Sequence, residues 1–325
     1  MSKSNKKQDN DKQRAVEQVG ETVEISEQPP VTTAELSEEQ IEIELNELAK
    51  TPKRERIWEI DFLRGLMILF VVWDHFMWDI RFINPSREYN SALFQWLYDL
   101  SNRYYGLAGH KGVLRDVTHD VFVSMFVLTS GISCSFSRSN GKRALKMMSF
   151  AILFSAVTYA ISAIIQEELT IYFNVIHVVA LSVTFYAGIE WIWAHCKKNW
   201  QKNIFGVIMF TITMTALIVG SCANNMGLHW TDLIFGESEW RAAVIKKFRL
   251  GGDYLSFLPD FGWFLVGVFL GKLVYRERKT VFPSVDARYV SPVTFCGRHS
   301  LWVYFISQIV MFGFVYLLHE MFQVL

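Results

Sequence analysis

The chain has 325 residues, of which 51% are hydrophobic and 15% aromatic, and its 32 basic and 32 acidic residues leave no formal net charge. The apolar residues come in blocks long enough to cross a bilayer, which excludes an ordinary soluble globular domain. Four widely spaced cysteines exclude a disulfide framework and match no metal-site spacing. We therefore predict an all-α integral membrane protein, a polytopic bundle of about seven transmembrane helices, and expect no metal and no nucleic-acid partner.

Residues 1–56 are rich in Lys, Asp, Glu, Gln and Ser and contain no apolar core of a signal peptide. This composition predicts a disordered cytoplasmic tail. Within it, Thr33–Lys50 predicts a short amphipathic helix that Thr33 would cap. The membrane domain would then cover residues 57–325, with its first span acting as an uncleaved signal anchor.

The first predicted span, Ile57–Trp78, is apolar but carries Asp61, Arg64, Asp74 and His75. An ionisable group at the centre of a bilayer costs roughly 3 kcal/mol, so such groups usually face protein or a water-filled cavity. In a helix, Arg64 and His75 would lie about 20° apart around the axis and about 16 Å apart along it. Asp61 falls on the same side, one turn before Arg64. The span therefore predicts a polar stripe facing the inside of the bundle.

Six further apolar segments are long enough to span: Asp120–Phe136, Ala144–Ile165, Tyr172–Trp193, Ile204–Cys222, Leu255–Tyr275 and Ser300–Phe322. The connections after the second, fourth and sixth spans are rich in Lys and Arg, whereas the connection QEELT after the third has neither. The positive-inside bias then predicts a multi-pass plasma-membrane protein with a cytoplasmic N-terminus and an external C-terminus.

His75 is the first candidate for catalysis, because an imidazole takes or gives a proton near neutral pH. Asp79 follows one turn later, where its carboxylate would orient the imidazole. The alternative is a histidine that is hydrogen-bonded at the membrane interface or packed between helices. Asp61 and Arg64 are three residues apart and allow two interpretations: an internal ion pair that stabilises packing, or a guanidinium placed for an anionic or carbonyl-bearing group.

Other polar residues predict a binding site for a donor. His177 lies within the fourth span near Asn174, where it would line the same cavity as His75 or hydrogen-bond to another helix. Arg298 and His299 precede the seventh span, and free backbone N–H groups at a helix start favour a phosphate. Together with Arg138, Lys142 and Arg143 they predict a basic inner face, for which ordinary topology-setting charge is the alternative.

Small residues in two spans predict close contacts between helices. Gly267 and Gly271 form a G-x-x-x-G pair in the sixth span, and Gly131 lies in a run of serines and threonines in the second. Ser130 lacks a G-x-S-x-G context and is not a predicted nucleophile. His110 and His119 lie in the long loop between the first two spans and match no strong metal motif.

Five segments, in chain order, carry a resemblance to a known family: RERIWEIDFLRGLMILFVVWDH, FVLTSGISCSFSR, NVIHVVALS, LPDFGWFLVGVFLGKLVYR and GRHSLWVYFISQ. They resemble the bacterial branch of the heparan-α-glucosaminide N-acetyltransferase catalytic-domain family, from about Ile57 to the C-terminus. The first segment is also similar to the wider transmembrane acyltransferases that O-acylate surface polysaccharides. In those enzymes an Arg and a His separated by ten residues on the first helix are essential, and Arg64 and His75 have that spacing.

The resemblance implies a transmembrane acyltransferase domain over residues 57–325. Its donor would be cytoplasmic acetyl-CoA or another acyl-CoA, and its acceptor a sugar amine or hydroxyl on an extracytoplasmic glycan or lipid-linked sugar. His75 would be the catalytic histidine, acting as a base or becoming transiently acylated, and Arg64 would shape the donor channel. In the lysosomal member the histidine lies in a luminal loop, whereas His75 lies on the predicted first helix.

Two other classes of function fit the same residues. A transporter or flippase would use Asp61, Arg64 and His75 to bind an anionic lipid or sugar in the bilayer, although the chain has no clear inverted repeat. A structural subunit would use these charges only to pair with one another. Association into a homo-oligomer is compatible with each of the three interpretations.

Overall fold

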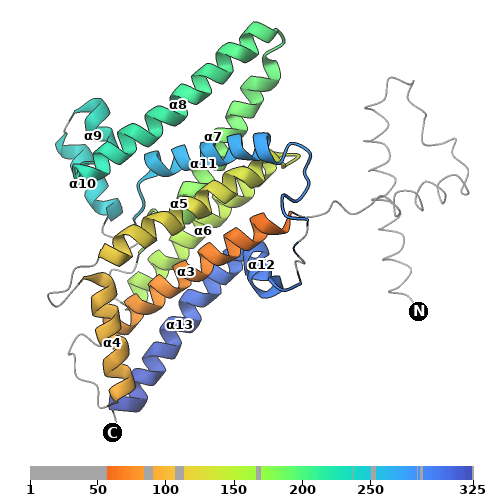
Figure 1. Cartoon of the computed structure of the whole chain (residues 1–325). Coiled ribbons are helices and arrows are strands. Elements are labelled where there is room, and N and C mark those ends of the chain that lie inside the picture. The colour runs from red at the N-terminus through yellow and green to blue at the C-terminus, as the bar shows by residue number, and fades with distance from the viewer. Residues whose placement is uncertain are drawn as a thin grey trace, which may run out of the picture. The chain divides into compact units, whose positions relative to one another are not determined.

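The computed structural model describes residues 57–83, 91–106, 113–165, 170–236, 238–249, 254–283, 285 and 288–323. Contacts divide the chain into two units, Met1–Arg56 and Ile57–Leu325. The described part of the second unit contains eleven helices, α3 to α13, and no strand, which confirms the all-α class (Figure 1). The predicted tail, with its proposed helix over Thr33–Lys50, lies outside the described residues.

Six helices correspond to the second to seventh predicted spans: α5 (Val113–Ser135), α6 (Asn140–Ile165), α7 (Val175–His195), α8 (Asn199–Asn225), α11 (Phe257–Val274) and α13 (Ser300–Gln323). Among the described residues, these are the helices long and apolar enough to cross a membrane. The chain is therefore a multi-pass membrane protein.

The first predicted span is α3 (Trp58–Ile83), a helix of 26 residues. It is long enough to cross a bilayer, but its charged residues keep it out of the apolar set of six. Helix α3 instead lies against α5, α12 and α13 (Figure 1). This position gives its polar residues protein neighbours, as the predicted polar stripe requires.

Four shorter helices lie in segments that hydropathy leaves as connections: α4 (Ala92–Tyr105), α9 (Trp230–Phe235), α10 (Glu239–Arg249) and α12 (Ser291–Arg298). Helix α12 corrects one expectation about the seventh span. Arg298 is the last residue of α12 and His299 is its C-cap, so neither residue opens α13. The separate helix arises because Pro292 favours a new helix start just before this segment.

Glycines allow two pairs of helices to approach closely. A Cβ atom on Gly267 would overlap the carbonyl of Leu128, and one on Gly131 would overlap the carbonyl of Phe264, so α5 and α11 meet at backbone distance. This confirms the packing role predicted for the glycines of α11. Gly65 and Gly297 bring α3 and α12 together in the same way.

Candidate functional site

Two cavities lie one after the other along α3. The first, here called the His75 chamber, has a volume of about 180 Å³, and its titratable lining residues are Asp74, His75, Arg115, His119 and Tyr254, together with Tyr304. The second, the Arg64 chamber, has a volume of about 120 Å³, and its polar lining residues are Arg64, Ser130, Arg143 and Ser300, again with Tyr304. The two ends of the predicted polar stripe thus face two separate chambers.

The chambers have four lining residues in common: Val71 of α3, Val123 of α5, Val175 of α7 and Tyr304 of α13. Since each of these residues borders both cavities, they mark the boundary at which the cavities meet, here called the shared wall. Arg64 and His75 therefore lie on either side of this boundary.

The Arg64 chamber is positively charged. Arg64 donates hydrogen bonds from Nη2 to the Thr129 carbonyl, at 3.1 Å, and to Ser133 Oγ, so α5 holds its guanidinium in place. Arg143, in the first turn of α6, faces the same chamber. Among the described residues, no carboxylate lines this chamber. Two guanidinium groups without a lining counter-charge fit an anionic or carbonyl-bearing ligand.

Asp61 forms its ion pair with Arg298 and not with Arg64. Arg298 Nε lies 3.1 Å from Asp61 Oδ2, across the close contact between α12 and α3. The predicted pairing within α3 is therefore wrong in its partner, because it considered spacing along one helix and α12 was not foreseen. Asp61 lines neither chamber.

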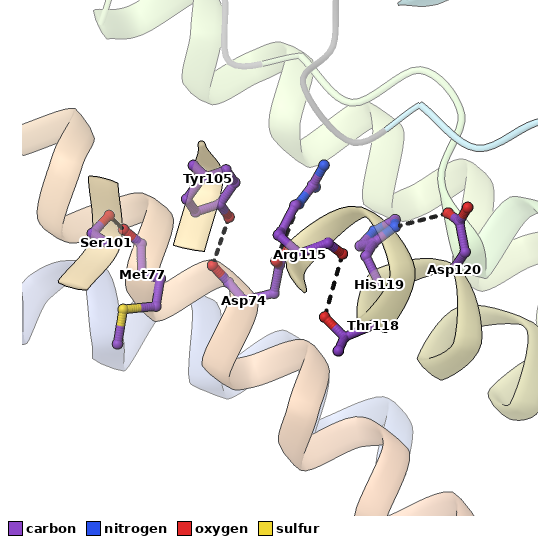
Figure 2. Close-up of polar contacts among 8 residues, drawn as sticks. All are labelled: Asp74, Met77, Ser101, Tyr105, Arg115, Thr118, His119 and Asp120. Atoms are coloured by element: carbon purple, nitrogen blue, oxygen red, sulfur yellow. Dashed lines mark hydrogen bonds and ion pairs between the residues drawn. The ribbon is translucent and has the colours of Figure 1, made fainter. Parts of the chain in front are cut away.

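The His75 chamber contains both signs of charge. Arg115 Nε lies 3.4 Å from Asp74 Oδ1, and the Arg115 guanidinium lies over the Tyr105 ring, 5.1 Å from its centroid. Tyr105 donates a hydrogen bond of 2.9 Å to the Asp74 carbonyl. Figure 2 shows Arg115 and His119 on α5, facing Asp74 of α3. This cluster offers carboxylate, guanidinium and imidazole groups around one small cavity.

The pKa shifts of the residues beside this cluster follow from burial and from Asp74. Burial, reinforced by the negative charge of Asp74, raises the pKa of Tyr104 to about 12 and also raises the pKa of Tyr105. Burial, the largest single influence, lowers the pKa of Arg115, but the charge and hydrogen bond of Asp74 together with the two nearby phenols outweigh it, so the pKa rises. At neutral pH the two phenols are therefore neutral donors and Arg115 is a cation.

His75 and His119 are the two imidazoles that line the His75 chamber. The His75 ring meets the Tyr304 ring edge to face, with centroids 5.9 Å apart. Asp79, one turn after His75, is buried within electrostatic range of that imidazole, and its Oδ2 has no hydrogen-bond partner among the described residues. Nδ1 of His119 lies 3.6 Å from the carboxylate of Asp120.

Helix α4 holds the part of α3 that carries His75. Ser101 Oγ donates a hydrogen bond of 2.7 Å to the Met77 carbonyl, and Tyr105 binds the Asp74 carbonyl (Figure 2). These contacts hold the last turns of α3 against α4. Hydropathy does not reveal α4, because its apolar residues alternate with polar ones around the helix.

His177 is held by hydrogen bonds at both ring nitrogens. Its Nδ1 lies 2.9 Å from Asn174 Oδ1, and its Nε2 lies 2.9 Å from Ser155 Oγ of α6. This is the contact between helices that was one of its two predicted roles. His177 does not line either chamber.

The predicted basic face is divided by the structure. Arg143 turns inward to line the Arg64 chamber, whereas Arg138, Lys142 and His299 are exposed at the same end of the bundle. Sequence reasoning missed Arg115, His119 and Tyr304 as lining residues. The spacing of four between Arg115 and His119 at the start of a long helix was the available signal for the first two.

A family model described as "Heparan-alpha-glucosaminide N-acetyltransferase, catalytic" matches residues 90–309, which is more than half of the chain. The chain belongs to this family. Membership indicates a membrane acetyltransferase, and the family uses acetyl-CoA as its donor in general. No curated protein and no solved structure matches the chain.

The family match is shorter than the resemblance predicted from Ile57 onward, and it does not distinguish a bacterial branch. It includes Arg115, His119, Arg143 and Tyr304 but begins after α3. The position of Arg64 and His75 in the site therefore rests on the two chambers.

Proposed function

We propose that the protein transfers an acyl group from cytoplasmic acyl-CoA to a sugar amine or hydroxyl on an extracytoplasmic glycan or lipid-linked sugar. The Arg64 chamber would hold the donor and the His75 chamber the acceptor. The observation that carries the proposal is the position of the two chambers end to end along α3, with a cationic lining in one and imidazoles in the other. Family membership supports the transferase class.

The residues of the Arg64 chamber fit the donor. Its phosphates would bind Arg143 together with the exposed Arg138 and Lys142 at the mouth. Arg64 would bind an amide carbonyl of the pantetheine arm, which would carry the thioester on to Tyr304. Charge-assisted hydrogen bonds of this kind are about twice as strong as neutral ones. When bound, acyl-CoA supplies an activated acyl group in a thioester.

In the His75 chamber, His75 would take the proton of the attacking amine or hydroxyl as the new C–N or C–O bond forms. The thioester C–S bond would then break, and the proton would pass from His75 to the departing thiolate. Asp74 and Arg115 would orient the acceptor, and Asp79 would stabilise the protonated imidazole. General base catalysis by a positioned side chain contributes about 10²–10⁴-fold. Holding the thioester and the acceptor against each other where the two chambers meet would contribute further.

The distribution of Lys and Arg supports a particular orientation of the helices across the membrane. Thr280 binds Glu59 at the start of α3, and Glu190 near the end of α7 binds Asn140 at the start of α6, so these ends lie on the Arg64 side. The connections rich in Lys and Arg are at these ends. The positive-inside bias therefore supports a cytoplasmic Arg64 chamber and a cytoplasmic N-terminus. The plasma membrane is the location proposed with this orientation.

Radiolabelled acetyl-CoA tests the proposal in membranes from cells that express the chain. We expect label to enter envelope glycans, and His75→Ala to reduce the initial rate by about 100-fold or more. His195→Ala is the matched control, because His195 is exposed at the end of α7 and lines neither chamber. It should leave the rate unchanged.

Two further variants locate the base. His119→Ala removes the second imidazole of the chamber. His110→Ala removes a histidine of the loop between the first two predicted spans, which lies outside the described residues. Full activity of His75→Ala with loss in either of these variants would overturn the role of His75. If acetyl-CoA labels no glycan but an anionic lipid or sugar moves across the membrane, the protein is a transporter and not a transferase.

A further inference from the structure

We infer that the shared wall, formed by Val71, Val123, Val175 and Tyr304, selects the length of the acyl group that is transferred. The inference deepens the proposed function and rests on it. These four residues stand between the site proposed for the thioester and the site proposed for the acceptor. An acyl group that reacts must therefore reach the acceptor past their side chains.

The three valines make this wall stiff. A valine has two heavy atoms on Cβ and one strongly preferred χ1 rotamer in a helix, so it yields little to a ligand. They come from three different helices, α3, α5 and α7, and Val123 is only 7% exposed. Stiff side chains from three helices, together with Tyr304 of α13, therefore line the passage between the chambers, here called the aperture.

Tyr304 is the polar member of the wall, and a chain of hydrogen bonds anchors it. Asn174 Nδ2 donates a hydrogen bond of 3.2 Å to Tyr304 Oη, and Asn174 in turn contacts His177, which binds Ser155 of α6. Tyr304 is 3% exposed and Asn174 is 1% exposed. Asn174 also caps α7, with His177, the third residue of the helix, completing its capping box. The two residues that fix the start of α7 thus also fix the Tyr304 ring at the aperture.

The anchored ring also contacts His75. The edge-to-face contact between Tyr304 and His75 links the aperture to the proposed base. A short acyl group would pass with the ring in place, whereas a longer chain would displace the ring and disturb the imidazole. The structure thus favours a donor with a two-carbon acyl group over donors with longer groups.

The test compares acetyl-, propionyl- and butyryl-CoA on the purified full-length protein. We measure dissociation constants by competition with labelled CoA, and initial rates of transfer to glucosamine, the sugar named in the family description. One methylene in an apolar pocket changes discrimination by about 10–200-fold, so the wild type should prefer acetyl-CoA to propionyl-CoA by at least roughly tenfold in kcat/KM. Val123→Ala should reduce that ratio by roughly tenfold and tighten butyryl-CoA binding relative to acetyl-CoA.

Val127→Ala is the matched control. Val127 is one turn along α5 from Val123, is fully buried, and lines neither chamber, so it loses the same two methyl groups without opening the wall. The ratio should not change. Tyr304→Phe keeps the ring but loses its anchor, and should lower the acetyl preference to an intermediate value.

The outcomes separate the two levels of the proposal. Suppose that the wild type binds acetyl-CoA and transfers its acetyl group. If Val123→Ala and Val127→Ala then show the same ratios between acetyl-, propionyl- and butyryl-CoA, in both dissociation constants and rates, the shared wall does not select the acyl length. If the wild type binds none of the three acyl-CoAs, the proposed function itself fails, and the inference fails with it.

Discussion

The two chambers differ in the charges that line them, although they share a wall and a helix. The Arg64 chamber has two guanidinium groups and no lining carboxylate among the described residues, whereas the His75 chamber pairs Asp74 with Arg115 and adds two imidazoles. A cationic chamber suits a polyanionic ligand, and a chamber with mixed charges suits proton transfer and an acceptor of low net charge. This difference in lining charge is the reason for proposing that donor and acceptor bind on opposite sides of the shared wall.

Arg64→Ala should produce the largest difference between the effect on the KM for acetyl-CoA and the effect on the KM for glucosamine. A hydrogen bond to a charged group contributes about 1.5–3 kcal/mol, so the variant should raise the KM for acetyl-CoA by roughly 10–150-fold. The KM for glucosamine should change little. An equal rise in both constants, measured in steady-state kinetics, would contradict the assignment of Arg64 to the donor.

Gly267→Ala should lower the stability of the folded protein without affecting one chamber more than the other. The added Cβ overlaps the Leu128 carbonyl, and overpacking of this kind lowers the free energy of unfolding by about 1–3 kcal/mol. Gly188→Ala is the matched control, because a Cβ there meets nothing within 4 Å and alanine favours a helix. Thermal unfolding in detergent should show a lower midpoint for the first variant only, with the ratio of the two KM values unchanged in both.

Arg115→Ala should affect the acceptor side alone. It leaves the buried carboxylate of Asp74 without its partner and removes one group that would orient the acceptor. We expect the KM for glucosamine to rise by roughly tenfold, since an unpaired buried group costs about 1–3 kcal/mol. Arg115→Lys keeps the charge and should recover part of the loss. A selective rise in the KM for acetyl-CoA would instead place Arg115 with the donor.

Asp61→Asn should have the smallest effect. Its ion pair with Arg298 is partly exposed, with side-chain exposures of 15% and 40%, and such pairs contribute about 0–1 kcal/mol. Thermal unfolding should shift by no more than a few degrees, and both KM values should stay within about twofold of the wild type. A large loss of transfer in Asp61→Asn would return Asp61 to the reacting groups.

Much of the fold follows from hydropathy, but much of the site does not. Long apolar runs predict six of the helices closely, and the stripe of Arg64 and His75 on α3 was predictable because helical geometry relates them directly. Contacts between helices depend on packing that the spacing of one segment does not encode. That is why Arg298, and not Arg64, pairs with Asp61, and why Tyr304 was missed inside an apolar span.

The most direct test of the two-chamber assignment is an experimental structure of the purified protein with bound CoA. The account predicts density for the phosphates beside Arg143, and density for the pantetheine arm that passes Arg64 and ends at Tyr304. Density that enters from the His75 side, or that lies outside the Arg64 chamber, would contradict it.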